Sequence, residues 1–290
     1  MMPLLGSFLR FHAKKYELVE HLFKNVVVVK NKEAITHDVH VLKLTTFQAG
    51  LREKHFLRTL NDRADRADRA DRSADDRSAD DRSNADLRVP RVVGCHPHPT
   101  TPSCCVLEST YVPGTDLLNH TIDRAPFTET QVMDVTRKCA AAIRRLRDHG
   151  IVHLDVKPEN IVLTHQGDVA VIDFESAHAL PAHVQTQSQH VDAFTPVTPE
   201  TCVTMKYASP EMLHRRTFHR NTDLWGVGLV ATVMLCGYHP QDVHPSLYPY
   251  HVASHVRQRA LRENWSTAST DYVTRLLSVT PHDRDRDGNA

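Results

Sequence analysis

The chain has 290 residues, 40% of them hydrophobic and 24% charged, and its 35 basic residues balance its 35 acidic residues. This composition is typical of a globular protein with room for two modest lobes, and zero net charge gives no field that would recruit nucleic acid or an anionic membrane. No apolar run reaches the roughly 18 residues of a membrane span, and residues 1–16 lack the charge order of a signal peptide. Six cysteines in a chain of this length indicate reduced thiols. We therefore expect an intracellular protein, in the cytoplasm or nucleus, that binds neither nucleic acid nor membrane.

The segment from Tyr16 to Lys43 predicts β-strands. Val26–Val29 is a β-branched run, and Val39–Leu42 alternates as a half-buried strand does. In Gln48–Leu60, leucine and phenylalanine residues recur at roughly helical spacing, which predicts a short helix.

A low-complexity insertion follows at residues 61–86. The triplet Asp-Arg-Ala occurs three times from Asp62, and the sequence then changes into Ala-Asp-Asp-Arg-Ser units. A period of three fits neither a helix nor a strand, and the segment has almost nothing to bury. We predict a solvated, disordered insertion, and a regulatory docking tail is the alternative.

Strand-like residues return between Arg91 and Leu107. Within them, Cys95–His98 and Cys104–Cys105 contain the side chains that bind zinc, but their spacing matches no closed zinc site. We therefore assign these residues to strands and keep a zinc site as a weaker alternative.

The pattern changes at Thr128, where apolar residues begin to fall on one helical face that ends before Gly150. Two short apolar runs follow at Ile161–Leu163 and Val169–Ile172, and Asp223–Leu235 is apolar like a buried helix. Strands first and helices afterwards predict an α+β protein with two lobes.

One loop carries the strongest chemical signal. The chain reads His-Leu-Asp-Val-Lys-Pro-Glu-Asn from His153 to Asn160, and Asp173-Phe174-Glu175 follows. An aspartate, a lysine and an asparagine at these intervals suit phosphoryl transfer. One carboxylate orients a hydroxyl, an ammonium neutralises the migrating phosphoryl group, and an amide with a second carboxylate holds magnesium.

This loop resembles the H-R-D-x-K-x-x-N sequence of the eukaryotic-type protein kinase superfamily at every position except the arginine. The lysine two residues after the aspartate is similar to the serine/threonine branch. The resemblance implies that Asp155 is the catalytic base and that Lys157 contacts the γ-phosphate. It also implies that Asn160 belongs to the catalytic loop and binds Mg²⁺ together with Asp173.

Three further segments resemble the family in the family's order. They are Thr204–Glu211, similar to the segment that ends in A-P-E, Asp223–Gly228, similar to D-x-W-x-x-G, and Thr280–Arg284, similar to D-P-x-x-R. By the same resemblance Thr204 bonds the catalytic aspartate and lysine, and Arg284 pairs with Glu211. The likeness covers about Tyr16 to Arg284 without the repeat.

The resemblance also implies nucleotide contacts. Tyr111–Leu117 looks like the hinge between the lobes, so the backbone groups of Thr110 and Val112 would meet adenine, and Asp116 would reach the ribose. We take Lys43 as the phosphate-binding lysine of the third strand, with Glu53 as its partner on the following helix. Lys30 is the alternative lysine.

Three positions depart from the family. The glycine-rich loop is replaced by His21–Val26, in which Phe23 and Val26 can be aligned but no glycine is present, so ATP should bind less tightly or in an altered pose. Glu175 stands where the family has the glycine of D-F-G. Leu154 replaces the arginine that clamps a phosphorylated activation loop, which suggests activity without that phosphorylation.

The sequence therefore predicts a bilobal protein-kinase fold over 16–284, with a small β-rich lobe at 16–112 and a larger helical lobe at 113–284. We expect ATP and Mg²⁺ to bind in the cleft and phosphate to pass to serine or threonine hydroxyls of protein substrates. A pseudokinase scaffold is the main alternative, because the glycine-rich loop is degenerate, and a small-molecule kinase of the aminoglycoside or choline type is a third. The compact first lobe and the repeat also resemble kinases of large DNA viruses. The sequence does not indicate an oligomeric state.

Overall fold

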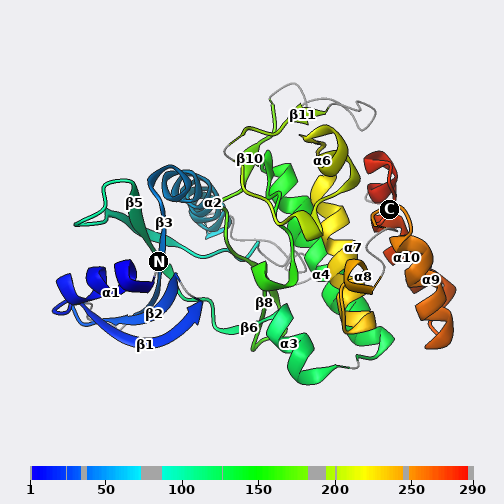
Figure 1. Cartoon of the computed structure of the whole chain (residues 1–290), viewed down its shortest axis with the longest axis horizontal. Helices are drawn as coiled ribbons and strands as arrows, with labels where there is room; N and C mark the ends of the chain where they lie inside the picture. Colours follow the sequence, from blue (N-terminus) through cyan, green and yellow to red (C-terminus); the bar gives the residue numbers. More distant parts are fainter. Residues whose placement is uncertain are drawn as a thin grey trace. The chain divides into compact units, whose positions relative to one another are not determined.

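The structure is a computed structural model that describes residues 2–23, 25–33, 38–72, 87–125, 127–181, 194–199, 201–243 and 248–286. The chain divides into two compact units (Figure 1). The N-terminal unit comprises Met1–Pro113 and Asp173–Glu175, and the C-terminal unit comprises Gly114–Ile172 and Ser176–Ala290. The predicted α+β class, with a β-rich first lobe and a helical second lobe, is confirmed.

The N-terminal unit is built on a five-stranded antiparallel sheet with the order β1-β2-β3-β5-β4. Successive side chains of β3 point to opposite faces of the sheet. Leu42 and Leu44 are buried on one face, and Lys43 lies on the other. The strands are β1 (Tyr16–Phe23), β2 (Val26–Asn31), β3 (Val39–Thr46), β4 (Val92–Pro97) and β5 (Cys104–Thr110).

An N-terminal helix, α1 (Met2–Phe11), covers the Leu42 face of this sheet. Its Leu5 and Phe8 are buried in one apolar cluster with Val27, Leu42 and other sheet residues. The predicted boundary at residue 16 therefore leaves out an element of the folded unit. Leu4 and Leu9 pack against the same cluster, and the spacing of three to four residues from Leu5 to Phe8 and Leu9 places these side chains on one helical face.

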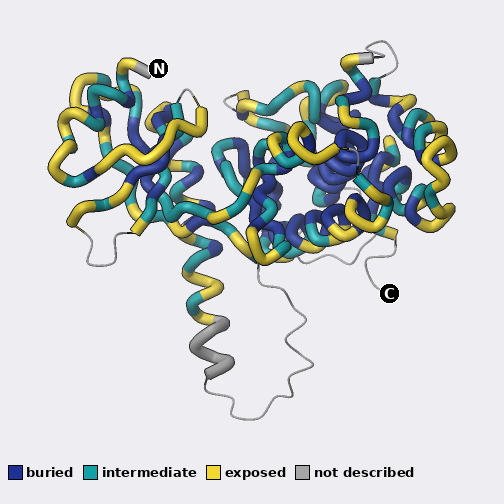
Figure 2. The backbone as a smooth tube through the Cα atoms, turned by 90° about the horizontal axis from the view of Figure 1, so that it is seen from below, coloured by how far each residue is buried: buried dark blue, intermediate teal, exposed yellow. Residues whose placement is uncertain are grey.

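The second helix, α2 (Phe47–Arg72), begins directly after β3 and is much longer than the segment Gln48–Leu60 suggested. The prediction of a disordered insertion is wrong for residues 61–72, which continue this helix. Arg, Ala and Asp all tolerate helix interiors, and Asp and Arg three or four residues apart can pair. Figure 2 shows burial decreasing along α2 after its first turns. The rest of the repeat, 73–86, lies outside the described residues.

The C-terminal unit is mainly helical, and its centre is formed by α4 packed against α7. Helix α4 begins at a capping box in which Thr128 and Gln131 exchange hydrogen bonds, as the helix predicted from Thr128 requires. Helix α7 is buried along nearly its whole length. The helices are α3 (Leu117–Arg124), α4 (Glu129–Asp148), α6 (Pro210–Arg215), α7 (Thr222–Cys236), α8 (Pro240–Val243), α9 (Val252–Arg262) and α10 (Thr267–Leu276).

Short strands hold the loops of this unit in place. The predicted apolar runs form β8 (Ile161–Thr164) and β9 (Val169–Val171), which pair with β6 (Gly114–Asp116) in a three-stranded sheet. Two further pairs join β7 (Ile151–Val152) to β10 (His178–Ala179) and β11 (Thr195–Pro196) to β12 (Thr217–Phe218). The loop with the strongest sequence signal therefore starts at the end of β7 and leads into β8.

Candidate catalytic and phosphate-contacting residues

Helix α7 holds the start of the catalytic loop. The Asp223 carboxylate accepts hydrogen bonds from the backbone N–H groups of His153 at 2.6 Å and Leu154 at 2.8 Å. Gly226, one turn further along α7, lets the loop come close, because a methyl group there would lie 2.7 Å from the carbonyl oxygen of Val156. Leu154 has a φ of 64°, an unfavourable conformation for a bulky residue, so these contacts fix a strained backbone.

The predicted catalytic residues of this loop meet at the Asp155 carboxylate. Asp155 Oδ2 lies 2.5 Å from Lys157 Nζ and accepts a hydrogen bond from Asn160 Nδ2 at 3.1 Å. Asp155 Oδ1 accepts from the backbone N–H of Thr204 at 2.8 Å. Lys157 Nζ also donates to Thr204 Oγ1 at 2.8 Å. The contacts expected of Thr204 with the aspartate and the lysine are therefore present, and four side chains hold one another in a single arrangement.

Asn160 is positioned by a second contact, because its Nδ2 also donates to the backbone carbonyl of Asp155 at 2.9 Å. Both amide hydrogens therefore point at Asp155, which turns the amide oxygen the other way. Oxygen is the ligand type that Mg²⁺ prefers. Asn160 in this orientation suits the metal-binding role that the sequence suggested.

Leu154, which replaces the arginine of the family, is buried in an apolar cluster of the C-terminal unit. The cluster contains Met212 and Phe218 among its buried members. An aliphatic side chain in this environment contributes to packing and has no group to bind a phosphate.

Glu211 and Arg284 form the buried ion pair that the sequence predicted. Arg284 donates to the two Glu211 carboxylate oxygens at 2.6 and 2.8 Å, and Arg284 is fully buried. Burial by itself raises the pKa of Glu211, but the hydrogen bonds and charge of Arg284 outweigh it and hold the pKa below its usual range. Such a bidentate pair gives strong geometric control, and its place here is structural.

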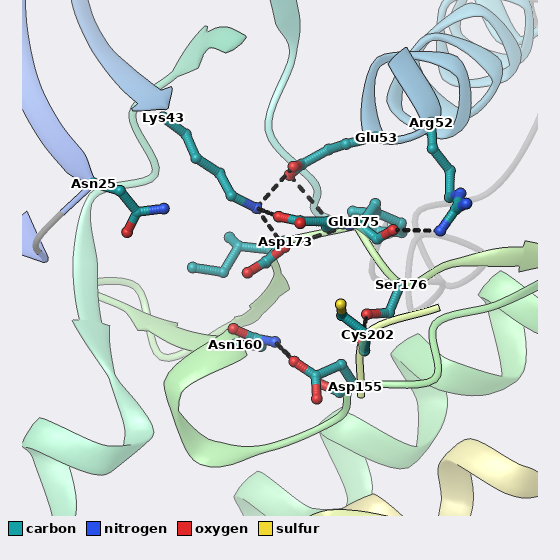
Figure 3. A network of polar contacts seen from close by, with 12 residues as sticks. Asn25, Lys43, Arg52, Glu53, Asp155, Asn160, Asp173, Glu175, Ser176 and Cys202 are labelled. Carbon is teal, nitrogen blue, oxygen red and sulfur yellow. Dashed lines mark hydrogen bonds and ion pairs between the residues drawn. The ribbon is translucent and has the colours of Figure 1, made fainter. Parts of the chain in front are cut away.

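In the N-terminal unit, Lys43 is surrounded by three carboxylates (Figure 3). Its Nζ lies 2.9 Å from Glu53 Oε2, 2.7 Å from Asp173 Oδ1 and 2.9 Å from Glu175 Oε2. The predicted pair of Lys43 with Glu53 is present, and Lys43 is the lysine that contacts Asp173. Lys30 is an exposed residue near the end of β2 and is not part of this cluster.

The charges of this cluster shift the pKa values of Lys43 and Glu53. Burial by itself lowers the pKa of Lys43, but the three carboxylates raise it well above its usual value. Burial and the charges of Asp173 and Glu175 raise the pKa of Glu53 to about 6, although Lys43 opposes them. Lys43 is therefore a permanent cation. Glu53 also accepts a hydrogen bond from the backbone N–H of Phe174 at 3.2 Å, which ties the Asp173–Glu175 segment to α2.

The hairpin between β1 and β2 replaces the glycine-rich loop. Phe23 pairs with Val26 at the ends of the two strands, so the connection contains two residues. Asn25, the second of them, donates from Nδ2 to the Leu44 carbonyl at 3.1 Å. Val26 pairs with Lys43 on β3, which places the hairpin beside the lysine. Lys24, between Phe23 and Asn25 in the sequence, lies outside the described residues.

The residues predicted to contact the base and ribose have structural partners of their own. The Thr110 N–H donates to the Arg91 carbonyl at 2.8 Å, and Val112 follows the end of β5. Asp116 is the N-cap of α3 and accepts from Asn119 N at 3.0 Å and from Asn119 Nδ2 at 2.7 Å. The structure therefore gives Asp116 a capping role, and its ribose contact stays a prediction.

The acidic side chains around Lys43 fit a hard cation chemically. Glu53, Asp173 and Glu175 can each offer a carboxylate oxygen within 4.8 Å of the others, and Mg²⁺ binds carboxylate oxygen. Among the parts of the chain that the structure describes, these three form the only such group of His, Cys, Asp and Glu side chains. Within the described residues, Cys95–His98 and Cys104–Cys105 do not form such a group, so the structure gives no support to the zinc alternative.

The histidines of that segment have another role that sequence analysis missed. His96 Nε2 lies 2.8 Å from Glu108 Oε2, and His40 Nδ1 lies 2.6 Å from Glu108 Oε1. Tyr16 donates to the same carboxylate at 2.8 Å, and Lys15 lies 3.5 Å away. Glu108 is fully buried on the face that α1 covers. The sequence signal that could have predicted this cluster is a single glutamate, Glu108, within the otherwise uncharged strand Cys104–Thr110.

Comparison with known proteins places these observations in a family. The sequence model of the protein kinase domain matches residues 68–285, so the chain belongs to the protein kinase family. The match starts after β1–β3, and it therefore does not include Lys43 or Glu53.

Individual relatives are kinases by name. A putative ribosomal protein S6 kinase alpha-2 from Caenorhabditis elegans is 30% identical over 215 residues, which are 67% of this chain and 27% of the relative. The calcium/calmodulin-dependent protein kinase cmkB from Emericella nidulans is 29% identical over 178 residues, 59% of this chain and 42% of the relative. The chain thus spans less than half the length of these relatives. Family and relatives support phosphotransfer, with the ATP and Mg²⁺ that are typical of the family.

Among the described residues, no helix combines the length and the apolar character that crossing a membrane needs.

Proposed function

We propose that this protein transfers the γ-phosphate of ATP to serine or threonine hydroxyls of protein substrates. The observation that carries the proposal is the arrangement around the Asp155 carboxylate, which is held by Lys157, Asn160 and the Thr204 N–H. A carboxylate fixed by three donors is a hydrogen-bond acceptor in a defined position. That is what is needed to orient an alcohol for attack on a phosphoryl group.

In this mechanism Asp155 accepts a hydrogen bond from the substrate hydroxyl and takes its proton as the new O–P bond forms. The bond from the γ-phosphorus to the bridging oxygen of ADP breaks in the same displacement. Lys157 donates hydrogen bonds to Asp155 and Thr204, and its ammonium supplies positive charge for the transferring group. Lys43 contacts the remaining phosphates, and Glu53 orients Lys43. Asp173 and Asn160 would each offer an oxygen ligand to magnesium, which would supply positive charge for the phosphates.

The proposal includes activity without a phosphorylated activation loop. Leu154 packs with apolar residues, where the family has a cationic phosphate clamp. The start of the catalytic loop is held by the Asp223 carboxylate, a contact that needs no phosphate. Phosphatase treatment of the purified protein should therefore leave its activity unchanged.

The direct test is transfer from radiolabelled ATP to generic basic and acidic protein substrates, with phosphoamino-acid analysis of the product. We expect phosphoserine or phosphothreonine from the wild type and none from Asp155→Asn. Equal incorporation by the two proteins would overturn the proposal.

The second candidate function is a pseudokinase scaffold that binds partners through the fold. It is favoured by the two-residue turn of the β1–β2 hairpin, which has no glycine, and by Glu175 at Lys43. Calorimetric titration with ATP and Mg²⁺ separates the candidates, because a scaffold without nucleotide binding gives no heat. Retention of all five residues Lys43, Asp155, Lys157, Asn160 and Asp173 favours the enzyme.

A further inference from the structure

Lys43 has more anionic partners than one ammonium can neutralise. Its three N–H bonds face Glu53, Asp173 and Glu175, all at 2.9 Å or less. A nucleotide phosphate is also an anion and needs one of these donors. In the described structure of the N-terminal unit, one carboxylate must therefore leave Lys43 before a phosphate can bind to it.

The three carboxylates differ in how firmly they are held. The Glu53 side chain is 6% exposed and also accepts from the Phe174 N–H. Asp173 Oδ1 accepts from the Glu175 N–H at 3.4 Å. The Glu175 side chain is 30% exposed, and within the described residues its carboxylate has an ion pair with Lys43 alone.

Arg52 does not hold the Glu175 carboxylate in place. Its guanidinium donates to the backbone carbonyl of Glu175 at 3.3 Å, as Figure 3 shows. The backbone of Glu175 is thus anchored to α2, whereas its side chain is free to rotate away from Lys43. Glu175 is the carboxylate that a phosphate can displace most easily.

We propose that Glu175 is an internal competitor of the nucleotide phosphates for Lys43, and that it makes nucleotide binding depend on a divalent cation. The inference rests on the proposed function, because it takes Lys43 as a phosphate ligand. A displaced Glu175 carboxylate stays near the phosphates and repels them, unless a cation lies between the like charges. Glu175 thereby selects the metal complex of the nucleotide over the free nucleotide.

The test measures the dissociation constant of ATP by calorimetry, with Mg²⁺ and separately with EDTA. Glu175→Gln is nearly isosteric and removes the charge. We expect it to tighten ATP binding about tenfold in EDTA and by a smaller factor with Mg²⁺. The control is Glu17→Gln, which removes one charge from an exposed position on β1 of the same unit and should change neither value. Glu175→Gly serves as a second variant, and thermal melting verifies that each protein is folded.

The outcomes separate this inference from the function on which it rests. A fall in the ratio of the two dissociation constants in Glu175→Gln, but not in Glu17→Gln, supports the inference. The same ratio in wild type and in both Glu175 variants overturns it and leaves the proposed function standing. If neither wild type nor variants bind ATP under any condition, the proposed function fails, and the inference fails with it.

Discussion

In the C-terminal unit, one group of buried polar side chains converges on the catalytic loop, and the Glu211–Arg284 pair is a second, structural group. In the N-terminal unit, buried polar side chains form two separate clusters on opposite faces of one sheet. Asp223 and Asn160 both serve the catalytic loop. On the sheet, Lys43 and its carboxylates lie on one face, and Glu108 with its histidines lies on the face beneath α1. The first cluster contains residues typical of the family, and the second consists of side chains for which the family comparison gives no role.

This difference shows where the family resemblance is concentrated and why. The catalytic loop places several contacting side chains within eight residues of sequence, so replacing one of them disturbs the positions of the rest. A sheet needs only a buried face, and many side chains can supply it. The family match begins at residue 68 and so leaves out β1–β3 of the N-terminal unit. We therefore expect variants of the catalytic loop to abolish chemistry and most variants of the N-terminal sheet to alter stability.

The largest effects should come from removing one charged group from each unit. Asp155→Asn keeps the shape of the side chain but removes the proton acceptor, so we expect kcat to fall about 1,000-fold with ATP affinity unchanged. Lys43→Met leaves three carboxylates without their cation, so we expect ATP binding itself to be lost. Steady-state kinetics and ATP titration measure the two quantities.

Asp271→Asn, on the exposed side of α10, is the matched control for the charge change and should behave as wild type. The division of roles is wrong if Asp155→Asn weakens ATP binding as strongly as Lys43→Met does.

The buried ion pair of the C-terminal unit should give the largest loss of stability. Arg284→Met leaves the Glu211 carboxylate buried without its cation, and we expect the free energy of unfolding to fall by about 3–5 kcal/mol. Arg286→Met is the control, because Arg286 is 65% exposed and pairs with Asp283 at the surface. Its loss should cost less than about 0.5 kcal/mol. Urea denaturation followed by circular dichroism compares the two, and similar losses would contradict the structural role of Arg284.

In the N-terminal unit, the helix α1 should contribute to stability although it precedes the predicted domain. Phe8 is fully buried against the sheet, whereas Phe11 of the same helix is 71% exposed. We expect Phe8→Ala to lower the free energy of unfolding by about 3 kcal/mol and Phe11→Ala to leave it nearly unchanged. Urea denaturation of wild type and the two variants measures these free energies. An equal, small effect of both changes would mean that α1 is an appendage.

Much of the fold could be predicted from local sequence. The valine runs became β2 and β3, and the helix expected after Thr128 is α4, because each pattern is set by neighbours in the chain. The apolar segment from Asp223 is the buried helix α7. The catalytic loop could be predicted for the same reason, since its residues lie close together in sequence.

The N-terminal unit was less predictable because its clusters depend on distant residues. Lys43 and Asp173 are 130 positions apart, and His40 and Glu108 are 68 positions apart. The sequence shows that Glu175 replaces the glycine of D-F-G. Its contact with Lys43 could not be predicted, because it depends on how β3, α2 and the Asp173–Glu175 segment are placed. Residues 61–72 were missed because a repeat of three hides the helical tendency of its residues.

The buried carboxylate under α1 should make stability depend on pH. Burial by itself raises the pKa of Glu108, but hydrogen bonds from His96, Tyr16 and His40, with the charge of Lys15, outweigh it and lower the pKa to about 2. The folded protein thus holds the ionised form more strongly than the unfolded chain does. Its contribution, roughly 2 kcal/mol, is complete above the ordinary glutamate pKa and is lost as pH falls from there toward 2.

Glu108→Gln tests this contribution. Urea denaturation of wild type and variant at pH 7, 5 and 3.5 should show the difference between them constant from 7 to 5 and smaller at 3.5. Glu20→Gln, at an exposed position on β1, removes a similar charge without the buried partners. A difference between wild type and Glu108→Gln that does not change with pH would show that the carboxylate contributes through packing alone.

The smallest effects should lie along α2, at the start of the repeat. Asn61 donates to the Pro90 carbonyl at 3.3 Å and accepts from the Val92 N–H at 3.2 Å, both partly buried. One turn later, Asp65 pairs with Arg91 at 2.6 Å, but the two side chains are 38% and 54% exposed. We expect Asn61→Ala to cost about 1 kcal/mol and Asp65→Ala less than about 0.5 kcal/mol, an amount that 0.5 M salt removes. Urea denaturation at low and high salt separates the two. If Asp65→Ala costs as much as Asn61→Ala at both salt concentrations, the first part of the repeat is a docked element of the N-terminal unit.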